Sequence, residues 1–280
     1  MLLAATNSTD STNYALTDAS LLYSLRNLYG YDGRIVVARR SSDNTLHTFT
    51  SSEITNGTLT SWVGSGNGFV HTWYNQVSNT NHMIQATNAN QPQIVENGSL
   101  ITRNGVPTLK VTSSSILMEI STTLNLTRAQ SIYAALYLPS TITAATPAQS
   151  VWRSTLTSVD GFGFGAQTGS LTNERLAWIT VSSSTPYGHG MLSDIAAGSH
   201  VFSALLGNTG NPLIRIDSVS RTLVAAAFGG FTSTIYPRGF TRIMGGFVGE
   251  FSEIQVYNAI FHDSTQYSEI ETDITNYYGI

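Results

Sequence analysis

Cysteine is absent from the 280-residue sequence, so neither disulfide bonds nor thiolate metal sites can stabilise the fold. Charge is also scarce: charged residues make up 11% of the chain, against roughly 25% in typical soluble domains. Lys110 is the single lysine. Hydrophobic residues reach 41%, which is enough to form a full core. Stability must therefore come from packing, and the surface must consist mainly of uncharged polar residues.

The low charge limits the partners that this surface can bind. The formal net charge is −4 and no basic stripe runs along the sequence, which excludes nucleic acid. A surface of Ser, Thr, Asn, Gln, Gly and Tyr instead suits sugars or other protein subunits. The opening MLLAATNSTD has a short apolar run but no positive charge before it, so it predicts neither a signal peptide nor a membrane anchor. We expect no membrane insertion.

Two segments have the periodicity of amphipathic helices, one near each end of the chain. In TDASLLYSLRNLYG, at 17–30, Asp18 can cap the first turn, Gly30 can end the helix, and one stripe holds Leu21, Leu22, Leu25 and Leu28. In DSTQYSEIETDITNYYG, at 263–279, a capping box comes first and is followed by an apolar stripe of Tyr267, Ile270, Ile274 and Tyr277. The sequence predicts that both helices lie on a sheet by these stripes.

Between these segments, short strand-like runs alternate with clusters of Gly, Asn and Ser. The expected strands are 34–40, 45–50, 107–111, 131–138, 150–156, 174–181, 200–206, 212–217 and 249–257. SIYAALYL, at 131–138, is apolar on both faces and should be a central strand. Short strands without intervening helices are typical of an all-β sandwich or jelly roll. We expect an N-terminal arm at 1–16 and a single β-sandwich domain at 17–280.

The stretch GFVHTWYNQVSNTNH, at 68–82, begins as an apolar strand and ends as a run of amides and hydroxyls. Regular alternation would place Phe69, His71, Trp73 and Asn75 on one face. Large aromatic residues in such a strand usually pack inside, so Trp73 is predicted to be a core residue. The exposed continuation from Asn75 is a candidate glycan-binding loop, although an ordinary Asn-rich loop would look the same. Its candidate ligand-binding residues are Tyr74, Asn75, Gln76, Asn79, Asn81 and His82.

Metal and cofactor sites are not indicated by the sequence. SSDN, at 41–44, and SNTNH, at 78–82, offer oxygen ligands of the type that Ca²⁺ takes, but neither has the acidic spacing of a calcium loop. The six histidines are scattered without an H-x-x-x-H pair, which disfavours zinc. We expect no metal and no cofactor.

Three stretches together carry a resemblance to a known family. They are SLRNLYGYDGRIVVARRSSDNTLHTF, GFVHTWYNQVSNTNHMIQATNANQPQIV and GGFVGEFSEIQVYNAIFHDSTQYSEIETDITNYYGI. They resemble the concanavalin A-like catalytic domain of arabinofuranosidase B enzymes, and the laminin G-like modules often carried by bacteriophage structural proteins. The resemblance is strongest over 20–112 and at the C-terminus, and it implies a jelly-roll β-sandwich with short helices near the N- and C-termini.

The sequence departs from the enzyme family at the residues on which the family's catalysis depends. The family segment Tyr-Asp-Gln-Ser-Gly-Asn-Gly stands here at 74–80 as YNQVSNT, without the carboxylate and both glycines. The resemblance also implies a nucleophilic glutamate after a His-Met pair and an acidic aspartate before the final glycine-rich strand. Glu174, in LTNERLAW, lacks that context, and TRIMGGFVGEF holds no aspartate. We therefore name no catalytic residue.

Glu250 and Glu253 need separate treatment, because glycoside hydrolysis uses two carboxyl groups about 5 to 5.5 Å apart in retaining enzymes. Three residues apart on one strand, they are expected to point to opposite faces and so not to converge. We expect a structural role, in which they accept hydrogen bonds from backbone or arginine. An active glycosidase would instead have to use Asp160, Glu174 or Asp217.

The sequence thus favours a non-catalytic structural or adhesive protein. The family resemblance suggests a bacteriophage virion component on the particle exterior, such as a capsid decoration protein or a tail adhesin, able to contact cell-surface glycan. The expected partners are other virion proteins and further copies of the chain, in a homo-oligomer such as a trimer, because the apolar MLLAA and the near absence of lysine leave edges to be covered. The alternatives are a glycoside hydrolase of the arabinofuranosidase type and a free extracellular lectin.

Overall fold

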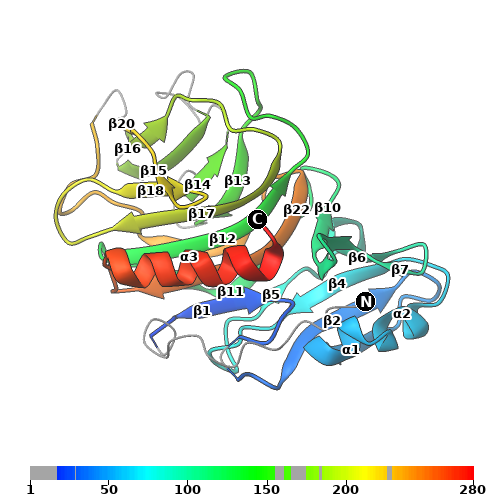
Figure 1. The fold of residues 1–280 in the computed structure, drawn as a ribbon. Helices are drawn as coiled ribbons and strands as arrows, with labels where there is room; N and C mark the ends of the chain where they lie inside the picture. Colours follow the sequence, from blue (N-terminus) through cyan, green and yellow to red (C-terminus); the bar gives the residue numbers. More distant parts are fainter. Residues whose placement is uncertain (1–17, 29, 155–160, 165–174, 183–184, 226–228) are drawn as a thin grey trace.

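The computed structural model describes residues 18–28, 30–154, 161–164, 175–182, 185–225 and 229–280. The expected arm at 1–16 lies outside these residues. The described strands pair in antiparallel fashion and build a β-sandwich, with one long helix, α3 (Ser264–Tyr278), lying along one face (Figure 1). This architecture confirms the prediction of an all-β sandwich.

The first sheet lies beneath α3, and β12 and β22 form its centre. In order across the sheet, its strands are β19 (Val219–Ser220), β18 (Leu213–Ile216), β17 (Gly198–Leu206), β12 (Gln130–Leu138) and β22 (Gly249–Asn258), followed by β1 (Leu21–Ser24) and β10 (Leu109–Val111), which pair with different halves of β22. The apolar run at 131–138 is therefore a central strand, as predicted.

The second sheet is longer and has β21 near its middle. In order, its strands are β20 (Val224–Ala225), β16 (Thr185–Met191), β15 (Leu176–Ser182), β14 (Gly161–Phe164), β13 (Gln149–Arg153), β21 (Gly239–Ile243), β11 (Met118–Asn125), β5 (Met83–Ile84), β4 (Gly68–Trp73), β2 (Arg34–Arg40) and β3 (Leu46–Thr50).

One short strand connects the two sheets. β6 (Gln93–Glu96) pairs with β4 of the second sheet and with β10 of the first. β7 (Ser99–Leu100) extends β6, and β8 (Thr102–Arg103) with β9 (Val106–Pro107) forms a separate hairpin. Every strand expected from the sequence overlaps an observed one, and the run at 107–111 is divided between β9 and β10.

Two groups of apolar side chains account for the core. The larger fills the space between the sheets and is rich in aromatic residues, including the fully buried Trp73, Trp152 and Trp178. The smaller lies between the first sheet and α3, where Tyr133 and Tyr257 meet Ile270 and Ile274. The first sheet is thus covered on both faces, which explains why the run at 132–138 in β12 is apolar on both faces.

The predicted helix at 17–30 is wrong. Its residues form strand β1, which pairs with β22 from Leu21 opposite Val256 to Ser24 opposite Glu253. Leu21 and Tyr23 belong to the inter-sheet core, whereas Leu22 belongs to the group beneath α3. A strand buried on both faces needs apolar residues at every position, and such a run also contains helical spacings. The hydrogen-bonded ladder with β22 decides between the two.

Two short helices were not expected from the sequence. α1 (Ser51–Thr55) and α2 (Thr58–Val63) lie beside β2 and β3 (Figure 1). α1 begins with a capping box: the Thr50 side chain accepts from the Glu53 backbone N–H, and the Glu53 carboxylate accepts from the Thr50 backbone N–H. That T-x-x-E signal is visible in the sequence and could have revealed α1.

The C-terminal helix is confirmed. Asp263 caps α3 and forms the predicted capping box with Gln266, while Gly279, at φ 65°, ends the helix in the left-handed conformation. Ile270, Ile274 and Tyr278 are buried against the first sheet, and Glu271 is buried with them. Its carboxylate accepts hydrogen bonds from Arg215 Nε at 2.8 Å and Ser203 Oγ at 2.7 Å.

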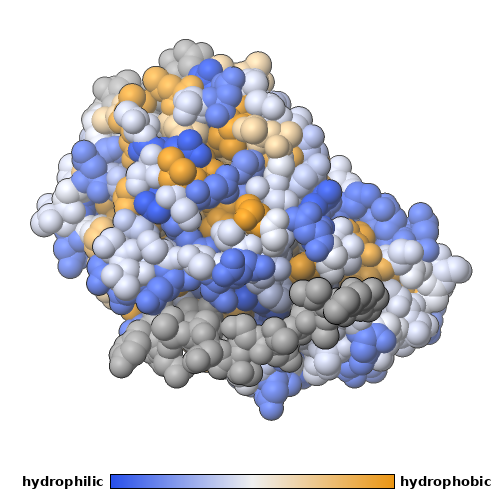
Figure 2. Space-filling view, in the orientation of Figure 1, coloured by the Kyte–Doolittle hydropathy of each residue, from blue (hydrophilic) through white to orange (hydrophobic). Residues whose placement is uncertain are grey.

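The surface is mixed in polarity. Figure 2 shows apolar side chains as small areas scattered among hydrophilic ones on the viewed face. Exposed large apolar residues nevertheless occur on edge strands, where Leu46 of β3 is 46% exposed and Val219 of β19 is 54% exposed. No helix in the described part of the chain is long and apolar enough to cross a membrane.

Candidate functional site

The strand β4 leads into the candidate glycan-binding loop, and its faces differ from the regular alternation. Trp73 lies opposite Val36 and Val70 lies opposite Ala38, so the ladder with β2 contains a bulge at His71. Because Val36 and Ala38 share a face, Trp73 and Val70 share it too. The predicted grouping of Phe69 with Trp73 is therefore wrong: Phe69 lies on the other face, with the Arg39 guanidinium 4.7 Å from its ring centroid.

Trp73 is a core residue, as predicted. Its side chain has no exposed surface, and its indole packs against Tyr23 and Phe251 at centroid distances of 6.0 and 6.3 Å. The indole Nε1–H donates to the Ser24 carbonyl at 3.1 Å. The ring is therefore packed and its N–H hydrogen-bonded inside the protein, so Trp73 is not an exposed platform for a sugar.

Asn75 and Gln76 are buried, contrary to the expectation that the exposed loop begins at Asn75. The Asn75 Oδ1 accepts from the Leu22 N–H at 3.0 Å. The Gln76 Oε1 accepts from the Leu28 N–H at 2.8 Å, and its Nε2 donates to the carbonyls of Ser24 and Arg26. These amides satisfy backbone groups of β1 itself and of the irregular segment that follows it.

The exposed part of the loop begins at Val77 and is shaped by Asn75. The Asn75 Nδ2 donates to Ser78 Oγ and to the Thr80 carbonyl, both at 3.2 Å, so one buried amide holds the turn. Asn79 is exposed, and Asn81 has a φ of 56°, in the left-handed region that asparagine tolerates. The Asn79 and Asn81 side chains have no hydrogen bond within the described part of the chain and remain available to a ligand.

An aromatic and basic group lies beside this loop. The rings of Tyr74 and His82 meet edge to face at 4.5 Å, and the Arg34 guanidinium lies 4.9 Å from the Tyr74 ring centroid. His82 Nδ1 accepts from the Asn75 N–H, so its proton resides on Nε2. Burial, and then the positive charge of Arg34, lowers the pKa of His82. A neutral imidazole N–H and two amides can hydrogen-bond a polyhydroxyl ligand.

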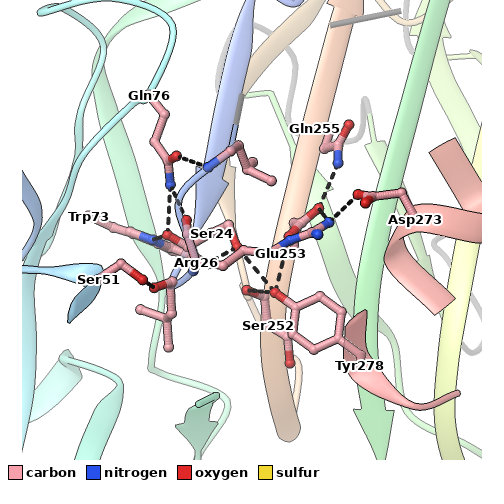
Figure 3. Close-up of polar contacts among 12 residues, drawn as sticks. Ser24, Arg26, Ser51, Trp73, Gln76, Ser252, Glu253, Gln255, Asp273 and Tyr278 are labelled. Atoms are coloured by element: carbon pink, nitrogen blue, oxygen red, sulfur yellow. Dashed lines mark hydrogen bonds and ion pairs between the residues drawn. The ribbon is translucent and has the colours of Figure 1, made fainter. Parts of the chain in front are cut away.

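A second polar cluster lies beneath the C-terminal end of α3, and we call it the Arg26 network: Ser24, Arg26, Glu253, Asp273 and Tyr278 (Figure 3). Arg26 Nε and Nη2 donate to Glu253 at 2.9 and 3.2 Å, and Nη2 also donates to Asp273 at 2.5 Å. Tyr278 Oη lies 3.1 Å from both Ser24 Oγ and Glu253 Oε2. β1, β22 and α3 are thereby joined in one buried network.

The buried carboxylate of the Arg26 network, Glu253, is paired with the Arg26 guanidinium. Burial opposes ionisation of Glu253, but the charge of Arg26 and its hydrogen bonds outweigh it, so the pKa of Glu253 lies below its usual range. Burial raises the pKa of Tyr278. Glu253 is deprotonated and is held by the Arg26 guanidinium and by the protonated Tyr278. It therefore has no proton to donate as a general acid. The Arg26 network therefore has a structural role. The sequence did not indicate it, because residues 17–30 were predicted to be a helix.

Glu250 is paired in the same way, with Arg103, whose Nε donates to Glu250 at 3.0 Å. The expectation that Glu250 and Glu253 point to opposite faces is wrong. In the pairing with β12, Glu250 lies opposite Tyr137 and Glu253 opposite Ala135, because a bulge at Ser252 shifts the register. Since Ala135 and Tyr137 share a face, both carboxylates do. Their expected structural role as arginine partners is confirmed.

Of the other acidic candidates for catalysis, the structure describes Asp217. Asp217 accepts from the Val201 N–H at 3.0 Å and lies 2.7 Å from His200 Nδ1. Asp160 and Glu174 lie outside the described residues. Within the ranges that the structure describes, no group of three or more His, Asp or Glu side chains is arranged to hold a metal ion.

Comparison with known proteins gives a likeness of fold. No family model and no curated protein matches this chain. Among solved structures, an arabinofuranosidase complexed with arabinofuranosyl-α-1,2-xylobiose aligns with a TM-score of 0.60 at 17% identity, over 91% of this chain and 62% of that one. A GH54 α-L-arabinofuranosidase soaked with a cyclic sulfate inhibitor aligns with a TM-score of 0.58 at 15% identity, over the same shares. This chain thus has the β-sandwich fold found in glycoside hydrolases, and it spans less than two thirds of these enzymes.

Proposed function

We propose that this protein is a non-catalytic structural or adhesive β-sandwich protein. We place it on the exterior of a bacteriophage virion, as a capsid decoration protein or a tail adhesin. The exposed end of the Tyr74–His82 loop would contact cell-surface glycan through Asn79, Asn81 and His82. The virion assignment rests on the laminin G-like sequence resemblance.

The non-catalytic part of this proposal rests on the ion pairs that Glu250 and Glu253 form with arginine. A retaining glycosidase needs one carboxylate free to attack and one carboxylic acid able to give a proton. Glu250 and Glu253, the acids nearest each other on β22, are each held by a guanidinium. Asn75 stands where the resembling enzymes have a carboxylate, and its amide is used to hold the Leu22 N–H and the loop.

The edges of the sheets support self-association. β3, β19 and β20 end the two sheets, and they carry exposed Leu46, Val219 and Val224 without any lysine. Solitary sandwiches usually protect such edges with charge, above all with lysine. A homo-oligomer such as a trimer, or docking onto other virion proteins, would cover them.

The arabinofuranosidase alternative is favoured by one observation, the likeness of fold to two arabinofuranosidases. An activity assay separates the proposals. We expect purified protein to release no arabinose from aryl arabinofuranosides or arabinan above the buffer rate. Turnover that disappears in Glu174→Gln, Asp160→Asn or Asp217→Asn would establish the enzyme instead.

The virion and oligomer parts are tested by mass. We expect light scattering to give a multiple of the monomer mass, and purified particles to hold the protein in stoichiometric, symmetric copies. Leu46→Lys and Val219→Lys add charge to exposed edges and should shift the mass towards the monomer, while Asn79→Ala should leave it unchanged. A monomer that enters no particle would contradict this part alone.

A further inference from the structure

An open cleft of about 380 Å³ lies at the edges of the two sheets, between the end of β16 and the segment that joins β19 to β20. Its lining is Leu192, Ser193, Ser220, Arg221, Thr222 and Val224. The volume falls within the range of about 300 to 1,000 Å³ that is usual for small-ligand pockets. The strands β16, β18 and β20 that surround it lie together in Figure 1.

Arg221 is the one lining residue with a formal charge, and no carboxylate lies within ion-pair distance of it in the described part of the chain. Its Nη2 donates to the Ile216 carbonyl at 3.3 Å, and its buried Nε has no hydrogen-bond partner there. A buried Nε is out of reach of a ligand, but Nη1 is neither buried nor hydrogen-bonded in the described part of the chain. Nη1 can therefore donate to an acceptor in the cleft.

Three carboxylates near the cleft, among the residues that the structure describes, each pair with a cation. Asp194, next to Ser193, pairs with Arg175 at 2.6 Å. Asp217 pairs with His200 at 2.7 Å, and Glu271 pairs with Arg215 at 2.8 Å. Each of these carboxylates has its own cation, so among the described residues the positive charge of Arg221 is a local surplus. The surplus favours a ligand with one negative charge.

The rest of the lining specifies what carries that charge. Ser220 Oγ accepts from Arg215 Nη1 at 2.9 Å, so its own hydroxyl hydrogen remains free to donate. The Ser193 and Thr222 hydroxyls can both donate and accept. Leu192 and Val224 are 46% and 36% exposed and would cover an apolar C–H face. Alternating hydroxyls and C–H groups around one carboxylate are the chemistry of an acidic sugar.

We propose that the cleft at Arg221 binds carboxylate-bearing sugars, either a hexuronic acid or a sialic acid. The guanidinium fork would take the carboxylate in a bidentate contact. The hydroxyls of Ser193, Ser220 and Thr222 would take the ring hydroxyls, and Leu192 and Val224 would lie against the ring. The proposal does not rest on the virion role or on the Tyr74–His82 loop, since it uses none of those residues.

The test is a titration of the full chain by isothermal calorimetry with sodium glucuronate, N-acetylneuraminate, glucose and acetate. We expect at least one of the two acidic sugars to bind at least tenfold more tightly than glucose and acetate, and which one binds identifies the source. Raising the salt concentration should weaken that binding. Equal binding of glucose, equal binding of acetate, or binding of none of the four overturns the proposal.

Two variants and two controls locate the binding. Arg221→Gln should lower the affinity at least tenfold, whereas Arg34→Gln, which removes an exposed arginine elsewhere, should not. Leu192→Asp places a negative charge at the exposed rim and should also abolish binding, which keeps the proposal testable if Arg221→Gln fails to fold. Asn79→Ala should leave acidic-sugar binding intact even where it removes neutral-glycan binding. Unchanged affinity for the acidic sugar in folded Arg221→Gln or in Leu192→Asp would contradict the proposal.

Discussion

The Arg26 network and the Tyr74–His82 loop are built from similar residues and do different things. Both lie next to β1, and both combine hydroxyls and an arginine, with carboxylates in the Arg26 network and amides in the loop. In the Arg26 network every polar group has a partner and all but Asp273 are buried, so the network joins β1, β22 and α3. In the loop, buried Asn75 and Gln76 hold the backbone, while Asn79 projects into solvent. Residue type alone does not show whether a side chain stabilises the fold or can bind a ligand. Burial decides this, because only exposed polar groups remain available to a ligand.

The largest effect should come from breaking the Arg26 network. Glu253→Ala leaves Arg26 buried, with only the partly exposed Asp273 as its partner. We expect a loss of about 3 to 5 kcal/mol in the free energy of unfolding, measured by urea denaturation. The matched control is Glu96→Ala, which breaks the exposed pair with Lys110 and should cost within about 1 kcal/mol. Equal losses would show that burial does not separate the two pairs.

Gln76→Ala should have the next largest effect, at the boundary between the two regions. It removes the partner of the Leu28 N–H and of the Ser24 and Arg26 carbonyls. We expect a loss of about 2 to 3 kcal/mol in a chemical denaturation experiment. Asn79→Ala, three residues later and exposed, should change stability by within about 0.5 kcal/mol. A costly Asn79→Ala would mean that the loop is structural to its tip.

Asn81 sharpens the comparison inside the loop. Its φ of 56° is unfavourable for residues other than glycine and asparagine. Asn81→Ala should therefore destabilise the protein by about 1 kcal/mol, while Asn81→Gly should be close to neutral. Differential scanning calorimetry of both variants separates backbone strain from the loss of the amide. If glycine costs as much as alanine, the side chain itself stabilises the fold.

The smallest effect should be the pH dependence of the tie between His200 and its neighbours. Nδ1 faces the Asp217 carboxylate at 2.7 Å and Nε2 faces the Ala196 carbonyl at 2.9 Å, so both nitrogens must carry protons. Burial and the charge of Arg221 act to lower the pKa of His200, but these hydrogen bonds raise it above its ordinary value. Stability from this group is complete below about pH 6.5 and is lost as pH rises through the raised pKa.

The measurement is the difference in urea midpoint between the native protein and His200→Gln, from pH 6 to pH 9. The difference should shrink as pH rises. Subtracting the variant is necessary because burial lowers the pKa of His189 and of His262 to about 4, and those groups lose stability towards low pH instead. A difference that grows with pH would show that His200 is neutral in the folded state.

The sequence predicted the strands and the C-terminal helix well because their signals are local. Short strand-like runs bounded by turn residues mark β2, β12 and β22, and the Asp263 capping box marks α3. The sequence also carries the signal of α1, a capping box at Thr50. The helix expected at 17–30 was wrong because an apolar run covered on both faces has no period that separates strand from helix.

The candidate site was predicted less well, because single-residue bulges change the face of every residue beyond them. The bulge at His71 moves Trp73 onto the face of Val70, and the bulge at Ser252 brings Glu250 and Glu253 to one face. Neither bulge has a glycine or another local signal at its position. Burial of Asn75 and Gln76 likewise depends on β1, which lies about 50 residues earlier in the chain.

By itself, the sequence determined what this protein can be built from: an uncharged polar surface, a cysteine-free core held by packing, and a mainly antiparallel β fold. Those properties follow from composition and short-range pattern, which are already complete in the unfolded chain. Only the tertiary structure decided which arginines are neutralised, which amides are buried, and that Arg221 lines a cleft without a carboxylate in the described part of the chain. Ion pairing and burial depend on residues far apart in sequence, and their energies exist only once the sheets and α3 have packed together.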